Sequence, residues 1–217
     1  ANSPHLYPLR FKPILKSKIW GGDKLKTQLN KTTDESNIGE SWEISGVTDD
    51  ITVVAEGELK GQNLQQILQY YKGQLVGQKV YNQFKEEFPL LIKFIDAADT
   101  LSVQLHPDDA LAKKRHNSFG KTEMWYVIDS EPNGFIIADF KEQLAANDLT
   151  YYIEQGDLQN QLKSYNVQPG DSFFITPGLV HAIGKGVLLA EIQQTSDITY
   201  RLYDWDRKDK QGNCRQL

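Results

Sequence analysis

The chain has 217 residues, enough for one domain with a substantial hydrophobic core. Hydrophobic residues make up 39% of it and charged residues 24%, which excludes disordered, collagen-like and coiled-coil proteins. The net charge of −5 provides no cationic field for nucleic acid or for an anionic membrane surface, so we expect neither as a partner.

Cysteine usage and the apolar runs indicate a compartment. Cys214 is the single cysteine, which excludes an internal disulfide and a thiolate-rich metal site and is typical of a reducing environment. The most apolar run, 88–97, is interrupted by Lys93 and Asp96 and is far shorter than the ~20 residues that cross a bilayer. No signal peptide is visible, so the sequence predicts a cytoplasmic protein.

The first third of the chain is predicted to contain an extended segment at a sheet edge and one helix. Residues 6–20 alternate apolar and polar side chains and include two prolines, which predicts extended structure at a sheet edge, followed by a turn at Gly21-Gly22. Residues 41–45 alternate in the same way. Apolar side chains at helical spacing predict a helix over about 63–72.

The rest of the chain is dominated by short segments rich in Val, Ile, Phe, Trp and Tyr, which predict strands. They are separated by turn residues, as at Glu131–Gly134, and by a second helical insertion over about 142–162 that is broken near Gly156. Many short strands with two helical insertions predict a mainly β fold, a single β-sandwich or barrel domain over 1–217. The predicted strands are 90–95, 102–105, 123–128, 135–139, 172–175 and 187–193.

Two histidines lie among side chains that bind metals. In the segment 101–109, strand alternation puts Gln104 and His106 on one face, so that their heads can converge on one ion. In the segment 169–182, a strand between two Pro-Gly turns precedes His181, which begins the next strand. This order of turns and strands is typical of a jelly roll.

Glu123 and Lys121 share one face at the start of an otherwise apolar strand, and buried charges need partners or a metal. Taken singly, each histidine could be a core residue, Glu123 an ion-pair partner of Lys121, and Gln104 a sheet-edge amide. Taken together, one Gln, one Glu and two His make a nitrogen and oxygen ligand set that fits zinc or another divalent first-row metal. The four tryptophans are expected in the core: Trp20, Trp42, Trp125 and Trp205.

Four ordered motifs resemble those of type I mannose-6-phosphate isomerases, in particular their short bacterial form. The motifs are Gln-Leu-His-Pro at 104–107, Gly-Lys-Thr-Glu-Met-Trp at 120–125, Thr-Pro-Gly-Leu-Val-His-Ala-Ile at 176–183 and Thr-Tyr-Arg-Leu-Tyr-Asp-Trp at 199–205. The resemblance implies a cupin fold, one zinc ion per chain, and interconversion of mannose 6-phosphate and fructose 6-phosphate through an enediol. Members of that family continue into a second, smaller β domain, which we expect to be absent or truncated in a chain that stops at Leu217.

The resemblance also implies roles for individual residues. The zinc ligands fall on Gln104, His106, Glu123 and His181, and the active-site arginine falls on Arg201. The positions around the substrate or its phosphate are Ser102, Lys121 and Arg207, and other polar pocket positions are Lys93, Glu191 and Asp197. The last three are also the candidates for proton transfer.

Several alternatives stay open at this point. A metal-dependent oxygenase would need only His106, Glu123 and His181, although Gln104 argues against it. A non-catalytic sugar-phosphate-binding cupin would keep the cationic residues, and a β-sandwich interaction module would leave the ligand set unexplained. For Arg201 itself, the alternative to catalysis is an ion pair with one of two nearby acids, Asp204 or Asp206.

Overall fold

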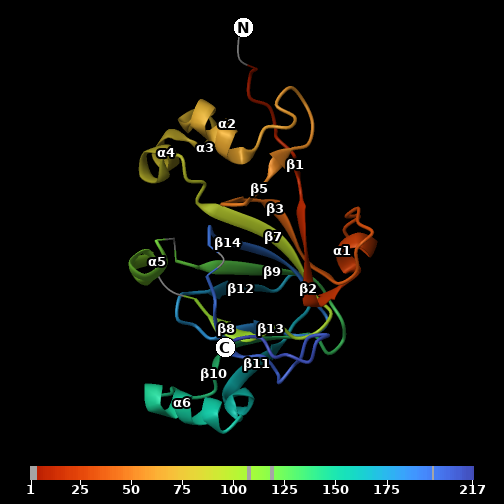
Figure 1. Cartoon of the computed structure of the whole chain (residues 1–217), viewed down its shortest axis with the longest axis vertical. Helices are drawn as coiled ribbons and strands as arrows, with labels where there is room; N and C mark the ends of the chain where they lie inside the picture. Colours follow the sequence, from red (N-terminus) through yellow and green to blue (C-terminus); the bar gives the residue numbers. More distant parts are fainter. Residues whose placement is uncertain (1–3, 107–108, 118–119, 197) are drawn as a thin grey trace.

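The computed structural model describes residues 4–106, 109–117, 120–196 and 198–217, which build two antiparallel sheets (Figure 1). Within these residues the larger sheet has six strands in the order β12-β9-β14-β7-β3-β2, and the smaller has five in the order β11-β10-β13-β8-β15. The larger sheet consists of β2 (Ile14–Gly22), β3 (Ile38–Ile44), β7 (Leu90–Ala97), β9 (Glu123–Ser130), β12 (Ser172–Ile175) and β14 (Val187–Gln194). The smaller consists of β8 (Val103–Leu105), β10 (Phe135–Phe140), β11 (Leu162–Asn166), β13 (His181–Ile183) and β15 (Tyr200–Tyr203).

From β7 onward the chain crosses repeatedly between the two sheets, since β7, β9, β12 and β14 lie in the larger one and the strands between them lie in the smaller. The predicted turn at Glu131–Gly134 makes one such crossing, from β9 to β10, and the Gly134 amide donates to the Glu131 carbonyl across it (2.9 Å). This alternation between facing antiparallel sheets is a jelly roll. The predicted mainly β fold with helical insertions is therefore confirmed.

The main core fills the space between the sheets. Trp125, Val127 and Leu189 point inward from the larger sheet and meet Ile136 and Ile183 of the smaller one, and each of the five is at most 3% exposed. Burying a side chain of this size contributes about 1.5–3 kcal/mol. Because side chains alternate along a strand, the inward face of β9 that carries Trp125 also carries the residue at its start, which is where the core gives way to polar residues.

The helices lie outside the two sheets (Figure 1). α2 (Leu64–Tyr71) begins at a capping box, in which the Asn63 side chain accepts from the Gln66 amide and the Gln66 side chain accepts from the Asn63 amide. This agrees with the predicted helix. The second predicted helix starts later than expected and is split, because Gly156 has a φ of +66° between α6 (Ala146–Glu154) and the 3-10 helix η1 (Leu158–Gln161).

Shorter elements complete the described part of the chain. The additional helices are α1 (Lys24–Thr27), α3 (Gly73–Val76), α4 (Gln78–Phe84) and α5 (Asp109–His116). Two small two-stranded ribbons pair β1 (Phe11–Lys12) with β6 (Val53–Val54) and β4 (Gly46–Val47) with β5 (Asp50–Ile51). Figure 1 shows α2, α3 and α4 grouped at one end of the molecule and α6 at the other.

The predicted turn at Gly21-Gly22 is wrong, because both residues lie within β2. A Cβ on Gly21 would lie 2.4 Å from the Asn37 carbonyl oxygen, and one on Gly22 would lie 2.7 Å from a carboxylate oxygen of Asp96. The close approach of neighbouring chain segments, and not a reversal, therefore requires glycine here. The predicted edge location is confirmed, since β2 ends the order of its sheet.

Candidate metal centre and active-site pocket

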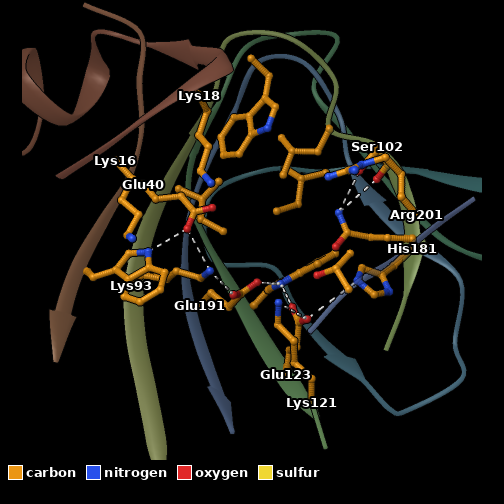
Figure 2. A pocket seen from close by; sticks show the side chains of 18 of the residues that line it. Lys16, Lys18, Glu40, Lys93, Ser102, Lys121, Glu123, His181, Glu191 and Arg201 are labelled. Atoms are coloured by element: carbon orange, nitrogen blue, oxygen red, sulfur yellow. Dashed lines mark hydrogen bonds and ion pairs between the residues drawn. The ribbon is translucent and has the colours of Figure 1, made fainter. Parts of the chain in front are cut away.

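A pocket of about 350 Å³ opens between the two sheets (Figure 2). Its ionisable lining residues include six cations, Lys16, Lys18, Lys93, Lys121, Arg201 and Arg215, and three acids, Glu40, Glu123 and Glu191. With all of them ionised, the lining carries an excess of three positive charges within a chain of net charge −5, and one of these cations, Lys16, is neutralised by Asp50 from outside the lining (2.8 Å). The pocket therefore favours an anionic ligand, in contrast to the protein as a whole.

Three of the predicted metal ligands converge at one wall of this pocket. Glu123 begins β9 and His181 begins β13, while His106 follows the end of β8. His106 Nε2 lies 2.5 Å from Glu123 Oε1 and 2.9 Å from His181 Nε2, and His181 Nε2 lies 3.8 Å from the same carboxylate oxygen. Each of the three residues is only 2% exposed. Two nitrogen ligands and one oxygen ligand thus lie within 4.8 Å of one another.

The hydrogen bonds of the two imidazoles fix their tautomers. His106 Nδ1 lies 3.2 Å from the Ile198 carbonyl oxygen and His181 Nδ1 lies 2.8 Å from that of Leu179, so each Nδ1–H donates to a carbonyl and each Nε2 keeps its lone pair. Burial lowers the pKa of both histidines, which keeps them neutral.

The carboxylate of Glu123 is deprotonated, which complements the neutral histidines. Burial alone would raise its pKa, but the positive charge of Lys121 and other nearby groups outweigh burial and lower it. Its Oε1 is buried without a hydrogen-bond partner among the described residues. Three lone pairs of His106, Glu123 and His181 therefore face one another with no proton between them, an arrangement that is repulsive unless a cation lies among them. The residues present fit a metal ion.

Gln104 lies beside this cluster. It faces His181 in the register of β8 and β13 and lines the same pocket. Its Nε2 donates to the carbonyl and the hydroxyl of Ser102 (3.2 and 3.3 Å), so that the amide oxygen of Gln104 is left to act as a ligand. Ser102 also lines the pocket, where it orients Gln104.

A buried ion-pair network adjoins the cluster on the side of the larger sheet. Lys93 Nζ lies 3.0 Å from Glu40 Oε1 and 3.4 Å from Glu191 Oε1. Both carboxylates raise the pKa of Lys93 against the effect of burial, so the lysine is charged. Burial and the neighbouring Glu123 raise the pKa of Glu191 to about 7.

Trp125 links this network to the metal-ligand cluster. Its indole Nε1 donates to Glu191 Oε2 (2.7 Å) and to Glu123 Oε2 (2.9 Å). Trp125 is 1% exposed, as expected of a core residue, and its N–H in addition fixes two pocket carboxylates.

Glu40, like the indole N–H of Trp125, has a role in the pocket that the sequence analysis did not predict. The available signal was strand alternation, which puts Glu40 on the same face as Trp42, and the Trp42 indole donates to Glu40 Oε1 (2.8 Å).

The Glu40 carboxylate should make stability depend on pH. Burial would raise its pKa, but the charges of Lys93 and Lys18 together with hydrogen bonds from Trp42 and Lys93 lower it from 4.5 to about 2. A lowered pKa means that the ion pair contributes stability above pH 4.5 and loses it as the pH falls toward 2, by about 3 kcal/mol in all. Glu40→Gln should therefore flatten the pH dependence of the unfolding free energy over this range, measured by urea titration between pH 7 and pH 3. Parallel profiles for the wild type and the variant would contradict the assignment.

Arg201 lies in β15 opposite Gln104 of β8, and it lines the pocket. Its Nη1 donates to the Gln216 carbonyl oxygen (2.9 Å), and its Nε is buried without a hydrogen-bond partner among the described residues. The alternative ion pair with Asp204 is not what the structure shows, because Asp204 accepts instead from Arg207 (2.6 Å) and from Arg215 (2.9 and 2.7 Å).

The remaining predicted substrate residues fall in three different places. Lys121 lines the pocket near the metal ligands, with its Nζ 3.8 Å from Glu123 Oε1. Arg207 is outside the pocket lining, since its guanidinium donates to Asp204, to the Thr100 carbonyl (2.7 Å) and to Asp99 (3.3 Å). This placement does not support a direct contact between Arg207 and a substrate. Asp197 lies outside the described residues.

Two facing sheets of a jelly roll, with histidines and a glutamate converging from strand ends into the space between them, define the cupin class of protein. The family model described as phosphomannose isomerase type I, catalytic domain, matches residues 9–145. The chain therefore belongs to the type I phosphomannose isomerase family.

Individual relatives agree with this family. The chain is 42% identical over 218 residues to the mannose-6-phosphate isomerase ManA of Bacillus subtilis and 40% identical over 210 residues to the mannose-6-phosphate isomerase of Streptococcus mutans. The crystal structure of the mannose 6-phosphate isomerase from Bacillus subtilis matches with a TM-score of 0.85 and 35% sequence identity. Each of these matches covers 97% of this chain and 65% of the relative, so the chain spans about two thirds of their length. Within the described residues, no helix has the length and apolar character to span a membrane.

Proposed function

We propose that this chain carries the catalytic site of a metal-dependent aldose–ketose isomerase, which interconverts mannose 6-phosphate and fructose 6-phosphate through an enediol. The observation that carries the proposal is the convergence of three unprotonated ligand atoms, from His106, Glu123 and His181, in a pocket with an excess of positive charge. Membership of the family and the names of two relatives support the choice of reaction.

We propose zinc as the metal, one ion per chain, held by Gln104, His106, Glu123 and His181. Imidazole nitrogens with carboxylate and amide oxygens, and no thiolate, suit a catalytic zinc ion. When bound, zinc supplies Lewis acidity that polarises the carbonyl group of the sugar and acidifies the adjacent C–H bond.

The other pocket residues bind the sugar and stabilise the charge that develops on it. Arg201 donates from its planar guanidinium to the oxygens that gain negative charge in the enediolate. Lys121 and Ser102 bind hydroxyl groups close to the metal ligands, and Lys93 and Glu191 bind hydroxyl groups from β7 and β14 of the larger sheet. Asp197 stays a prediction from the resemblance alone. The free, exposed thiol of Cys214 supports a reducing compartment, which we propose to be the cytoplasm.

The direct test is incubation with mannose 6-phosphate, followed by a coupled assay for fructose 6-phosphate and by NMR in D2O. We expect mannose 6-phosphate to be converted to fructose 6-phosphate, and the reverse when fructose 6-phosphate is supplied. Some deuterium should be incorporated at the carbon next to the carbonyl, because a protein base holds the transferred proton while the enediol exists and exchanges it with the solvent.

The alternatives give different results in the same experiment. Binding of mannose 6-phosphate without any conversion would indicate a non-catalytic sugar-phosphate-binding cupin. Consumption of oxygen with the metal-loaded protein, in place of isomerisation, would indicate an oxygenase built on His106, Glu123 and His181. Either result would overturn the proposed reaction.

A further inference from the structure

The cations of the pocket differ in whether a carboxylate neutralises them. Lys16 pairs with Asp50 (2.8 Å), Lys93 pairs with Glu40 and Glu191, and Lys121 lies 3.8 Å from Glu123. Lys18 has no such partner: within the described part of the chain, its Nζ has neither an ion pair nor a hydrogen bond. Glu40 acts on it electrostatically, but the Oε1 of that carboxylate already accepts from Lys93 and from Trp42.

Lys18 is held in the pocket by the geometry of β2. Alternation along this edge strand puts Lys16, Lys18 and Trp20 on the inward face, and Trp20 is buried in the core at 4% exposure. Figure 2 shows the Lys18 side chain entering the cavity from the side opposite His181 and Ser102. Lys18 itself is half-buried, and burial lowers its pKa, as do the charges of Lys93, Lys16 and Arg215. An anionic group of a ligand beside Lys18 would offset the cost of burying this charge.

Arg215 supplies a second donor that is fixed in orientation. Its Nε and Nη2 donate to the two carboxylate oxygens of Asp204 (2.9 and 2.7 Å), and Arg207 Nη2 donates to the same carboxylate (2.6 Å). Within the described residues, Arg215 Nη1 has no hydrogen-bond partner, and Arg215 lines the pocket. All three cations, Lys18, Arg201 and Arg215, line the same pocket, and the positive charge of Arg215 lowers the pKa of the other two.

We propose that Lys18 and Arg215 bind the dianionic phosphate group of the substrate, at the end of the pocket away from His106, Glu123 and His181. The choice of a sugar phosphate rests on the proposed function, whereas the site itself rests on the two donors. A lysine point charge and the free donor of an oriented arginine suit the three oxygens of a phosphate group. Arg207 then acts as a positioning residue, because it holds Asp204, which in turn holds Arg215.

The placement of Lys18 and Arg215 determines which sugars the pocket binds. A pocket of about 350 Å³ with the metal ligands on one side and these two donors on another is matched to a linear sugar that carries its carbonyl group and its phosphate at opposite ends. A hexose without phosphate would leave Lys18 unpaired and should be a poor substrate.

The test compares Lys18→Gln with Lys16→Gln in the intact chain. The two lysines lie two residues apart on the same face of β2, but the charge of Lys16 is neutralised by Asp50. We expect Lys18→Gln to raise the dissociation constant of inorganic phosphate, measured by calorimetry, and the KM for mannose 6-phosphate by at least ~10-fold each, which is the usual effect of losing one charge-assisted hydrogen bond. Turnover should change less than about threefold, and Lys16→Gln should change every value less than about threefold. Lys18→Arg should restore phosphate binding.

The results for these variants test the phosphate site and the proposed isomerase function separately. Unchanged phosphate affinity in Lys18→Gln, an equal effect in Lys16→Gln, or no phosphate binding by the wild type would overturn the assignment. Loss of phosphate binding only in Lys18→Gln, in a protein without isomerase activity, would support the phosphate site and contradict the proposed function. Isomerase activity with an unchanged KM in Lys18→Gln would do the reverse. Thermal melting of each variant checks that it is folded.

Discussion

Replacing Arg201 with lysine should lower turnover of mannose 6-phosphate by at least ~100-fold. Lysine keeps the positive charge but loses the planar guanidinium, and a preorganised donor to a developing oxyanion is typically worth this factor. Because the contact strengthens as charge appears on the enediolate, the loss should fall on kcat and kcat/KM more than on KM. Metal content and melting temperature should barely change.

The structural alternative for Arg201 makes the opposite forecast. An arginine that only anchors the C-terminal segment, through its hydrogen bond to the Gln216 carbonyl, would lose melting temperature on substitution while the folded fraction kept near-normal turnover. Turnover, metal content and melting temperature measured on one preparation separate the two roles. Near-normal turnover would remove Arg201 from the catalytic set.

Removing the metal should have the largest effect of all. Lewis-acid activation of a carbonyl is worth several kcal/mol, so chelation, or the double substitution His106→Ala with His181→Ala, should lower activity by at least ~1000-fold. Zinc should restore the chelated wild type but not the double variant. His116→Ala is the matched control, because this histidine lies on α5 and contacts the Tyr200 hydroxyl (2.9 Å), outside the cluster. Full activity after chelation would mean that the reaction needs no metal.

Strand placement was largely predictable from the sequence because it depends on local alternation and on turn residues. The segment 172–175 lies between two Pro-Gly turns and coincides with β12. Gly21-Gly22 misled the same reasoning, since glycine serves turns and close strand contacts alike. Only the neighbouring Asn37 carbonyl, contributed by another segment, distinguishes the two cases.

The candidate site was predictable where its residues sit in compact motifs. Strand faces and the family resemblance together pointed to Gln104, His106, Glu123 and His181, and the structure brings the last three into contact distance. Their tautomers were beyond prediction, because the carbonyl groups of Ile198 and Leu179 that fix them come from chain geometry and not from side-chain type.

The positive side of the pocket could not be derived in this way. Lys16 and Lys18 look alike in the sequence, and only the position of Asp50 across from one of them leaves the other unpaired. The same limit applies to Arg207 and Arg215, both of which bind Asp204 while only Arg215 lines the pocket. Which of two similar cations faces a ligand depends on contacts between distant segments, which no local pattern encodes.

Elemental analysis of the protein purified without chelator, compared with the His106→Ala, His181→Ala double variant, tests the metal centre most directly. We predict about one zinc per chain in the wild type and almost none in the variant, because the two Nε2 atoms are nitrogen ligands of the proposed site. Absence of a stoichiometric transition metal from the wild type, or equal metal content in the two proteins, would show that these histidines and Glu123 do not form a metal centre.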